Sequence, residues 1–394
     1  ICDGIGTLWV CLSLLGLRGT RVFGVSAEWE ADLSELQHFH FPQVHQFGDA
    51  TLLDSGRLMR MASECHTLVL AGAPPCQPLS GLSSDPQGFK DPRAAPLLKF
   101  FALRKELQEQ CRLSNVRFHC FLEEVASMKE EYRQFITSEM ECQPGILPSA
   151  DFGWLHRNRL IWGPDWAKAA LLTIPAIEIV PPGTLIPDCW VIRWLGAPNP
   201  PQWEPHQAAL SKTLCGTRNQ HIPGTPWQPE YPRGRFLTFT TVFHHPADRG
   251  AGVSSEGRRI FREDGQRFPL SSYTEGNLVT SDQGYPRPLN AEEREELMGL
   301  PRHFTSRLKP SDIKMHDSGS DVARKTENAR CSAIGNGWHV PTMTLLLFIM
   351  FEAVKGETSG VTPMPESIHC EWAIPPGSWS AQHIPGSFWD LEGP

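Results

Sequence analysis

The residues with the clearest chemical potential in this chain lie where short apolar segments end. Cys76 stands in Pro74-Pro75-Cys76-Gln77, after the apolar run 67–71 and a Gly-Ala pair. The prolines restrict the backbone and hold the thiol in a fixed orientation. Open α/β sheets carry out their chemistry at the carboxyl ends of strands. Taken alone, a free cysteine is more often a small buried residue than a nucleophile, so the surrounding residues decide.

Two groups of charged residues further along the chain also lie at the ends of apolar segments. The apolar segment 118–122 ends in Glu123-Glu124-Val125, and Arg157 and Arg159 enter another apolar segment. Side chains two residues apart on a strand point to the same face, so the two arginines are expected to face one way. A thiol, a carboxyl group and two arginines can support covalent attack on an electron-poor heterocycle.

The order Pro-Cys-Gln, Glu-x-Val, Arg-x-Arg resembles the cytosine-5 DNA methyltransferases. Other segments extend this resemblance over residues 2–350. Asp3-Gly4-Ile5-Gly6-Thr7 is similar to the family's glycine-rich cofactor loop, Glu28 to the acid that takes the ribose hydroxyls, and Asp49 to the adenine-binding aspartate. The segments 287–301 and 335–341 match the ninth and tenth motifs. His-Arg-Asn-Arg at 156–159 and Trp338 are similar to the eukaryotic de novo class, whereas Pro-Pro-Cys-Gln is closer to bacterial and maintenance enzymes.

The resemblance implies methyl transfer from S-adenosylmethionine to carbon 5 of a flipped-out cytosine in double-stranded DNA, without a metal. Cys76 would attack carbon 6, Glu123 would neutralise nitrogen 3, Arg159 would contact the carbonyl oxygen, and Arg157 would support the cysteine. Glycine lets the backbone approach a cofactor closely. The expected cofactor-binding residues are Asp3, Gly4, Ile5, Gly6, Thr7, Glu28, Trp29, Asp49, Ala50, Pro75, Asn336, Gly337 and Trp338. The expected DNA-binding residues are Ser80, Ser83, Arg218, Arg233, Arg235, Arg258 and Arg259.

One position departs from the family pattern. Where the family has Glu-Asn-Val, this chain has Glu123-Glu124-Val125. A second carboxyl group could favour the protonated form of Glu123, or it could repel the thiolate and slow its attack. The sequence leaves both outcomes open, and with them the level of activity.

Composition agrees with a large enzyme of a reducing compartment. The chain has 394 residues, of which 40% are hydrophobic, enough for a large core and two or three domains. Its eleven cysteines are odd in number and include no Cys-x-x-Cys pair, which argues against zinc and a disulfide framework. No signal peptide is visible, and the apolar run 343–351 is too short to cross a membrane. Because Ile1 stands almost inside a motif, we expect a domain of a longer protein.

The net charge of −8 argues against DNA binding, since phosphate contacts favour a basic surface. The charge is unevenly distributed, however. Residues 211–270 hold nine basic and five acidic side chains, and all but one of the basic ones are arginine, which reads guanine edges and phosphates well. The segment therefore favours a nucleic-acid contact, with a solvated loop of incidental charge as the alternative.

The pattern of segments predicts an α/β fold with a doubly wound, mostly parallel sheet, as in the Rossmann-like class I S-adenosylmethionine-dependent methyltransferases. Residues 1–165 alternate strands and helices and form the expected cofactor-binding and catalytic lobe. Residues 166–286, rich in Pro, Gly and Trp, suit a smaller, irregular, β-rich target-recognition domain. Residues 287–354 are expected to complete the catalytic lobe, and 355–394 to form a loosely ordered tail.

Three alternatives stay open. The chain could be an inactive relative that acts as a DNA-binding or regulatory module, which Glu124 would explain. It could methylate cytosine in tRNA, although the Cys-Phe-Thr signature of those enzymes is not seen. It could also be an unrelated thiol enzyme with a histidine base. The resemblance implies a nuclear location, or a cytoplasmic one for a bacterial or viral protein, and leaves homo- or hetero-oligomers and flanking regulatory domains undecided.

Overall fold

A computed structural model describes most of the first half of the chain and much of the last third. The described residues are 1–15, 23–80, 87–149, 155, 157–163, 177–180, 190–194, 253–273, 278–280, 286–301 and 303–356. Most of the expected target-recognition domain and the segment 357–394 lie outside them. The expected division into four regions therefore stays a prediction.

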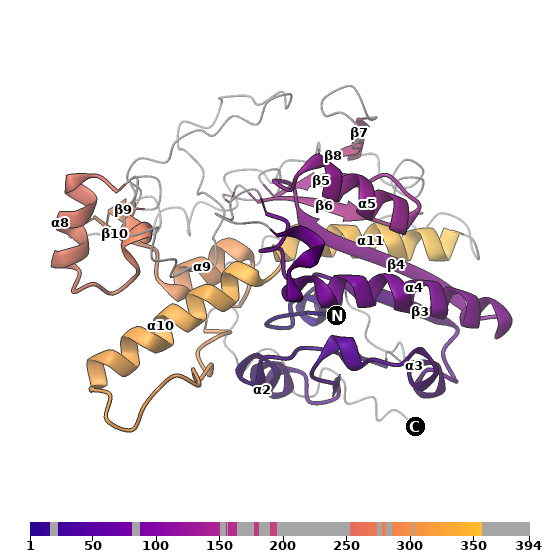
Figure 1. Ribbon diagram of the computed structural model, residues 1–394, viewed down its shortest axis with the longest axis horizontal. Helices are drawn as coiled ribbons and strands as arrows, with labels where there is room; N and C mark the ends of the chain where they lie inside the picture. The colour runs from indigo at the N-terminus through magenta and orange to yellow at the C-terminus, as the bar shows by residue number, and fades with distance from the viewer. Residues whose placement is uncertain are drawn as a thin grey trace.

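The site is organised by a six-stranded sheet with the order β3-β4-β6-β5-β8-β7 (Figure 1). β3 pairs parallel with β4, and β5 pairs parallel with β8, whereas β6 runs antiparallel to both β4 and β5 and β7 runs antiparallel to β8. The strands are β3 (Thr67–Gly72), β4 (Arg117–Val125), β5 (Gly145–Pro148), β6 (Asn158–Trp162), β7 (Ile177–Val180) and β8 (Trp190–Trp194).

The α/β class is thus confirmed, with more antiparallel pairing than the expected mostly parallel sheet. The connection from β5 to β6 is short and contains no described helix, so the chain returns beside the strand it has just left, in the opposite direction. A second, two-stranded parallel sheet joins β1 (Val25–Ser26) to β2 (His45–Gln46).

Both faces of the six-stranded sheet are covered by apolar side chains. Along β4, Phe121 joins a core cluster formed mainly with the first and last helices, whereas Cys120 and Leu122 join a second cluster. This alternation follows from the period of two on a strand. The second cluster is completed by α4 (Ala95–Leu113) and α5 (Glu130–Met140). On the first face, α1 (Thr7–Leu14) packs against α11 (Val340–Gly356), so segments from both halves of the chain share one core.

The first two residues connect the two sheets. The Ile1 amino group donates to the Ala71 carbonyl at 2.8 Å, and the Ala73 amide donates to the Ile1 carbonyl at 3.1 Å. The Cys2 amide donates to the Ala27 carbonyl at 2.8 Å. Ile1 and Cys2 therefore lie between β1 and β3, and the loop that follows them starts beside the ends of both strands.

Several helices and short 3-10 turns connect the strands in the first half of the chain. α2 (Ala31–His40) and α3 (Ser55–Met61) lie near the small sheet, with the short 3-10 helix η1 (Ala50–Leu52) between β2 and α3. Two more 3-10 turns, η2 (Gly88–Lys90) and η3 (Pro92–Ala94), lead into α4, whose first turn contains a proline as expected.

The later part of the chain adds α8 (Ser255–Glu263), the turn η7 (Leu270–Tyr273) and the hairpin-like pair β9 (Leu278–Thr280) and β10 (Pro286–Pro288). In Figure 1 these elements lie to one side of the large sheet, with α9 (Ala291–Met298) and α10 (Gly319–Asn336) between them and the sheet. α11 then runs back along the strands.

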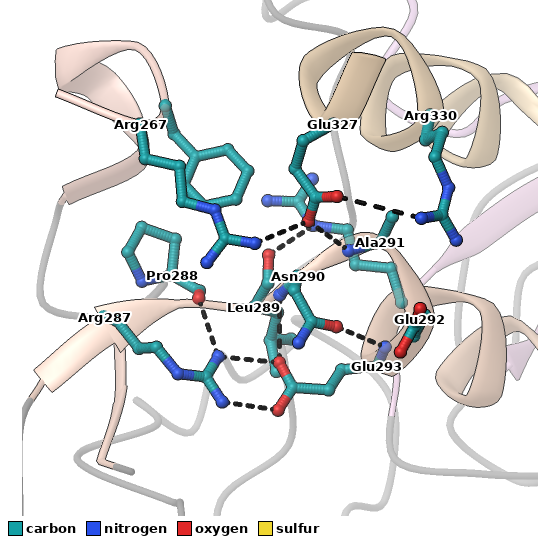
Figure 2. A network of polar contacts seen from close by, with 12 residues as sticks. Arg267, Arg287, Pro288, Leu289, Asn290, Ala291, Glu292, Glu293, Glu327 and Arg330 are labelled. Atoms are coloured by element: carbon teal, nitrogen blue, oxygen red, sulfur yellow. Dashed lines mark hydrogen bonds and ion pairs between the residues drawn. The ribbon is translucent and has the colours of Figure 1, made fainter. Parts of the chain in front are cut away.

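A polar network fixes the start of α9 (Figure 2). The Asn290 side chain accepts from the Glu293 amide at 2.8 Å, and the Glu293 carboxylate accepts from the Asn290 amide at 2.9 Å, a reciprocal cap at the start of the helix. Glu327 of α10 accepts from the Ala291 amide at 2.9 Å and from Arg267 at 3.1 Å. The carboxylate of Glu327 therefore joins α10, α9 and the segment after α8.

Within the described residues, no helix is long and apolar enough to cross a membrane. None of the eight described cysteines forms a disulfide, and no group of three or more His, Cys, Asp or Glu side chains in the described part of the chain could hold a metal ion.

Candidate active site

Cys76 lies at the carboxyl edge of the large sheet, four residues after β3. Gly72, the last residue of β3, pairs with Leu122, so Glu123 follows at the same edge. The Cys76 carbonyl accepts from the Leu79 and Ser80 amides at 3.0 and 2.8 Å, which closes a tight turn just after the thiol. The cysteine is thus fixed by prolines on one side and by a hydrogen-bonded turn on the other. Residues 81–86, which follow this turn, lie outside the described residues.

Glu123 and Arg159 form an ion pair at this edge, with Arg159 Nε 2.5 Å from Glu123 Oε1. The register explains the contact: Val125 lies opposite Arg159 and Glu123 opposite Ile161, so Glu123 and Arg159 are diagonal neighbours on one face. Both side chains are largely buried. Glu123 and Arg159, two of the predicted catalytic residues, are therefore in direct contact in the structure.

Glu124 points to the opposite face, since successive strand residues alternate. Its partner in register, Leu160, belongs to the cluster beside α4 and α5, against which Cys76 also packs. The carboxyl group is only 1% exposed; Oε2 accepts from the Val125 amide at 2.9 Å, and Oε1 has no partner among the described residues. Burial raises the pKa of Glu124 to about 8, with the charge of Glu123 adding to the rise. Glu124 is therefore neutral at pH 7.

Arg157 is buried at 3% exposure and donates through Nη2 to the Gly337 carbonyl at 2.7 Å. Its Nε and Nη1 have no hydrogen-bond partner among the described residues. Burial and the neighbouring Arg159 lower the pKa of Arg157 to about 9, whereas Glu123 and Cys76 act in the opposite direction. The guanidinium therefore remains a cation at neutral pH and keeps two free donors inside the site.

The thiol itself is hard to ionise in this state. Burial raises the pKa of Cys76 to about 11, and Glu124 and Glu123 contribute to the rise, while Arg159 and Arg157 lower it. Only the thiolate is a strong nucleophile. The two arginines are consequently the groups that favour the reactive form of Cys76.

The glycine-rich loop lies at the ends of β1 and β3 and leaves room beside its backbone. Gly4 has φ 59° and Gly48 has φ 70°, in the left-handed region that glycine adopts readily, and a Cβ added to either would meet no atom within 4 Å. The Glu28 carboxylate accepts from the Gly4 amide at 3.0 Å, and Gln37 donates to the Gly4 carbonyl at 2.6 Å. These residues fit a bound cofactor, because the Gly4 backbone, the Glu28 carboxylate and the open space beside the glycine lie next to one another.

The other expected cofactor residues surround this loop. The carboxyl group of Asp3 is buried, and burial raises its pKa to about 7. Trp29, beside Glu28, exposes 74% of its surface, as an aromatic side chain available to a ligand would. Asp49 is exposed and caps η1 by accepting from the Thr51 amide at 2.8 Å, while Ala50 is buried.

The late segment 335–341 meets the same loop. The Trp338 amide donates to Thr7 Oγ1 at 3.2 Å, and the Trp338 ring lies 5.7 Å from that of Phe121 between centroids. Gly337 lies against Ile5 and Thr7, where a Cβ would be 3.3 Å from either side chain. The structure thus brings together predicted residues that are more than 300 positions apart. Asn336 is exposed at the end of α10, and Pro75 is half-buried beside Cys76.

The predicted DNA-binding residues are described only in part. Ser80 is buried, and its hydroxyl lies 3.4 Å from that of Ser127. Arg258 and Arg259 are exposed on α8, where Arg259 forms ion pairs with Glu256 and Glu263 on its own helix. That pairing reduces the charge that Arg259 offers to phosphate. Ser83, Arg218, Arg233 and Arg235 lie outside the described residues.

Sequence reasoning missed several residues that complete the site. Gln37 supports the glycine loop, and Ser149, Thr342 and His339 surround Arg157. Spacing gives no signal for Ser149 or Thr342, because their contacts join segments 193 residues apart. His339 belongs to a motif that the sequence analysis quoted, but nothing in that motif indicates its partner.

No family model and no curated protein matches the sequence. The comparison with solved structures found several similar chains. A mutant of DNMT2 from Spodoptera frugiperda has a TM-score of 0.48 and 18% identity, covering 89% of this chain and 98% of that one. The Dnmt2 methyltransferase of S. pombe has a TM-score of 0.42 and 14% identity over 90% and 97% of the two chains. A putative DNA modification methyltransferase of an E. coli prophage has a TM-score of 0.44 and 16% identity over 88% and 98%.

Proposed function

We propose that this chain is an S-adenosylmethionine-dependent methyltransferase of the cytosine-5 family and that it acts on DNA. One observation carries the proposal. Cys76, the Glu123–Arg159 ion pair and the buried Arg157 meet at the edge of the sheet where the glycine-rich loop leaves open space. The ordered motifs that resemble the family supply the same residues. DNA as the substrate, rather than RNA, and a nuclear location rest on that resemblance.

The chemistry of cytosine explains each side chain. Carbon 5 is a weak nucleophile, so the Cys76 thiolate first forms a bond from Sγ to carbon 6. Negative charge then develops at nitrogen 3, and Glu123 neutralises it by donating a proton. That step requires the carboxyl group, which Arg159 holds in place, to be protonated when the base is bound. Arg159 polarises the carbonyl oxygen of the ring. A base within a duplex must be flipped out to reach these groups.

The cofactor would be held by Gly4, Glu28, Asp49 and Trp338 with their neighbours. When bound, S-adenosylmethionine supplies an electrophilic methyl group for carbon 5. Transfer of the carbon 5 proton to solvent then breaks the bond between Sγ and carbon 6 and returns the thiolate, while the proton on nitrogen 3 goes back to Glu123. The open space at Gly4 and Gly48 supports this assignment, because any larger residue there would be strained by its positive φ and would fill that space.

Transfer of a tritiated methyl group from S-adenosylmethionine to unmethylated duplex DNA tests the proposal. We expect incorporation with the wild-type chain and with Cys65→Ser, a matched control at a half-buried cysteine outside the site. We expect none with Cys76→Ser. Incorporation into tRNA instead of DNA would show that RNA is the substrate. Incorporation that persists in Cys76→Ser would show that Cys76 is not the nucleophile.

An inactive homologue is the second candidate, and one observation favours it. The buried Glu124 carboxyl group ionises above about pH 8, and its charge then raises the pKa of a thiol that already stands at about 11. Cofactor binding without methyl transfer, followed by transfer in Glu124→Asn, would establish that alternative and identify Glu124 as the residue that switches off the reaction.

A further inference from the structure

A buried ring of polar contacts surrounds Arg157. Ser149 Oγ donates to the Arg157 carbonyl at 2.8 Å, and Thr342 Oγ1 donates to Ser149 Oγ at 3.3 Å. Thr342 Oγ1 also lies 2.7 Å from His339 Nδ1. The ring closes through the Arg157 side chain, which donates to the carbonyl of Gly337, two residues before His339. Three elements contribute: the end of β5, the start of β6 and the start of α11.

The members of this ring are shielded from water. Ser149 is 1% exposed, His339 and Thr342 are each 4% exposed, and Arg157 is 3% exposed. Burial, with the nearby charge of Arg157, lowers the pKa of His339 to about 3. The ring is therefore neutral apart from Arg157.

The ring holds Arg157 at both ends of the residue. Ser149 fixes the backbone carbonyl, and the Gly337 carbonyl fixes one end of the guanidinium group. The two remaining donors, Nε and Nη1, have no partner among the described residues. Leaving charged donors unpaired in a dry site costs free energy, so such an arrangement is expected where the charge serves the chemistry. The groups that feel this charge include Cys76, Glu123, Arg159 and His339.

We propose that Ser149, Thr342 and His339 are positioning residues that hold the free face of Arg157 beside Cys76. The late segment 337–342 would then control the reactivity of a thiol located more than 250 positions earlier. The effect on catalysis rests on the proposed function, whereas the effect on the thiol does not depend on it.

The test compares two buried threonines of the same helix. Thr342→Val removes the hydroxyl from the ring, Thr342→Ser keeps it, and Thr344→Val removes an equally buried hydroxyl outside the ring. Iodoacetamide alkylation of Cys76 is followed between pH 7 and 10 by mass spectrometry of its peptide. We expect Thr342→Val to slow alkylation about tenfold at fixed pH, which corresponds to about one pKa unit for the thiol. Thr342→Ser and Thr344→Val should match the wild type.

A double-mutant cycle separates positioning from simple damage. In an Arg157→Met background, Thr342→Val should slow alkylation no further, because the residue that it positions is already gone. Equal slowing in both backgrounds, or slowing by Thr344→Val as well, would overturn the proposal. If Thr342→Val does not fold, Ser149→Ala interrupts the same ring at a second place and carries the same expectation.

The same variants distinguish this inference from the proposed function. With an active wild type, Thr342→Val should lower kcat for methyl transfer about tenfold and leave KM for S-adenosylmethionine unchanged. A wild type that transfers no methyl group, but whose Cys76 reactivity still depends on Thr342, would retain the positioning role and reject the function. If Thr342→Val transfers methyl groups and its Cys76 reactivity is unchanged, the proposed function is retained and the positioning role is rejected.

Discussion

At the scale of single residues, the site is a balance of charges around one thiol. Arg157 and Arg159 favour the thiolate of Cys76, and burial with the two glutamates opposes it. Glu123 is paired with Arg159, whereas Glu124, on the other face of the strand, has one oxygen without a partner in the described part of the chain. A lone buried carboxylate would be costly, so Glu124 keeps its proton. A protonated Glu124 adds no negative charge beside Cys76.

The proton on Glu124 predicts an unusual pH dependence. Below about pH 8 Glu124 is neutral; above it, the carboxylate raises the pKa of Cys76 further. We therefore expect Glu124→Gln and the wild type to transfer methyl groups equally at pH 7, and the variant to be several-fold faster at pH 9. Glu131→Gln, on the exposed side of α5, is the control and should follow the wild type. Parallel pH profiles for the wild type and Glu124→Gln would contradict a proton held on Glu124.

At the scale of elements, the position of Cys76 depends on how β3 packs on α4. An added Cβ at Gly72 would lie 2.6 Å from the Phe100 ring, which is fully buried in α4. Phe100 cannot retreat without disturbing the second core cluster. The end of β3, and with it the turn that holds the thiol, is therefore set by one strand-to-helix contact.

Gly72→Ala should accordingly be destabilising. We expect a loss of about 1–3 kcal/mol in the free energy of unfolding, the usual cost of overpacking, and a lower rate of methyl transfer. Gly319→Ala is the matched control, because a Cβ there meets no atom within 4 Å at the start of α10. Chemical denaturation measures both variants. Equal stability of Gly72→Ala and Gly319→Ala would show that the contact with Phe100 does not set the end of β3.

The start of α9 gives a second prediction at this scale. Asn290→Ala removes the side chain that accepts from the Glu293 amide, and a lost cap costs about 1 kcal/mol. Asn290→Ser keeps an oxygen at the same place and should retain most of that stability. Thermal unfolding compares the two. A melting temperature as low for Asn290→Ser as for Asn290→Ala would assign the effect to another role of Asn290 in the network of Figure 2.

At the scale of the whole molecule, features set by local sequence patterns could be predicted from the sequence, whereas features set by contacts between distant segments could not. Strand ends marked by apolar runs predicted that Cys76 and Glu123 lie at one edge of the sheet, because the parallel strands β3 and β4 end there. Arg157 and Arg159 reach the same edge because β6 starts there and runs antiparallel to β4. The cap of α9 was also predictable, since it uses residues three positions apart. The antiparallel course of β6, the burial of Glu124 and the ring of Ser149 and Thr342 were not, because each depends on contacts between distant segments.

The central claim is that Cys76 forms a covalent bond to carbon 6 of cytosine. Duplex DNA with fluorine at carbon 5 of its cytosines tests it most directly, because fluorine cannot leave as a proton does and the adduct persists. With S-adenosylmethionine present, we expect the wild-type chain and Cys65→Ser to give a DNA-linked band in a denaturing gel and Cys76→Ser to give none. No adduct from a folded, cofactor-binding wild type, or an adduct from Cys76→Ser, would contradict the account.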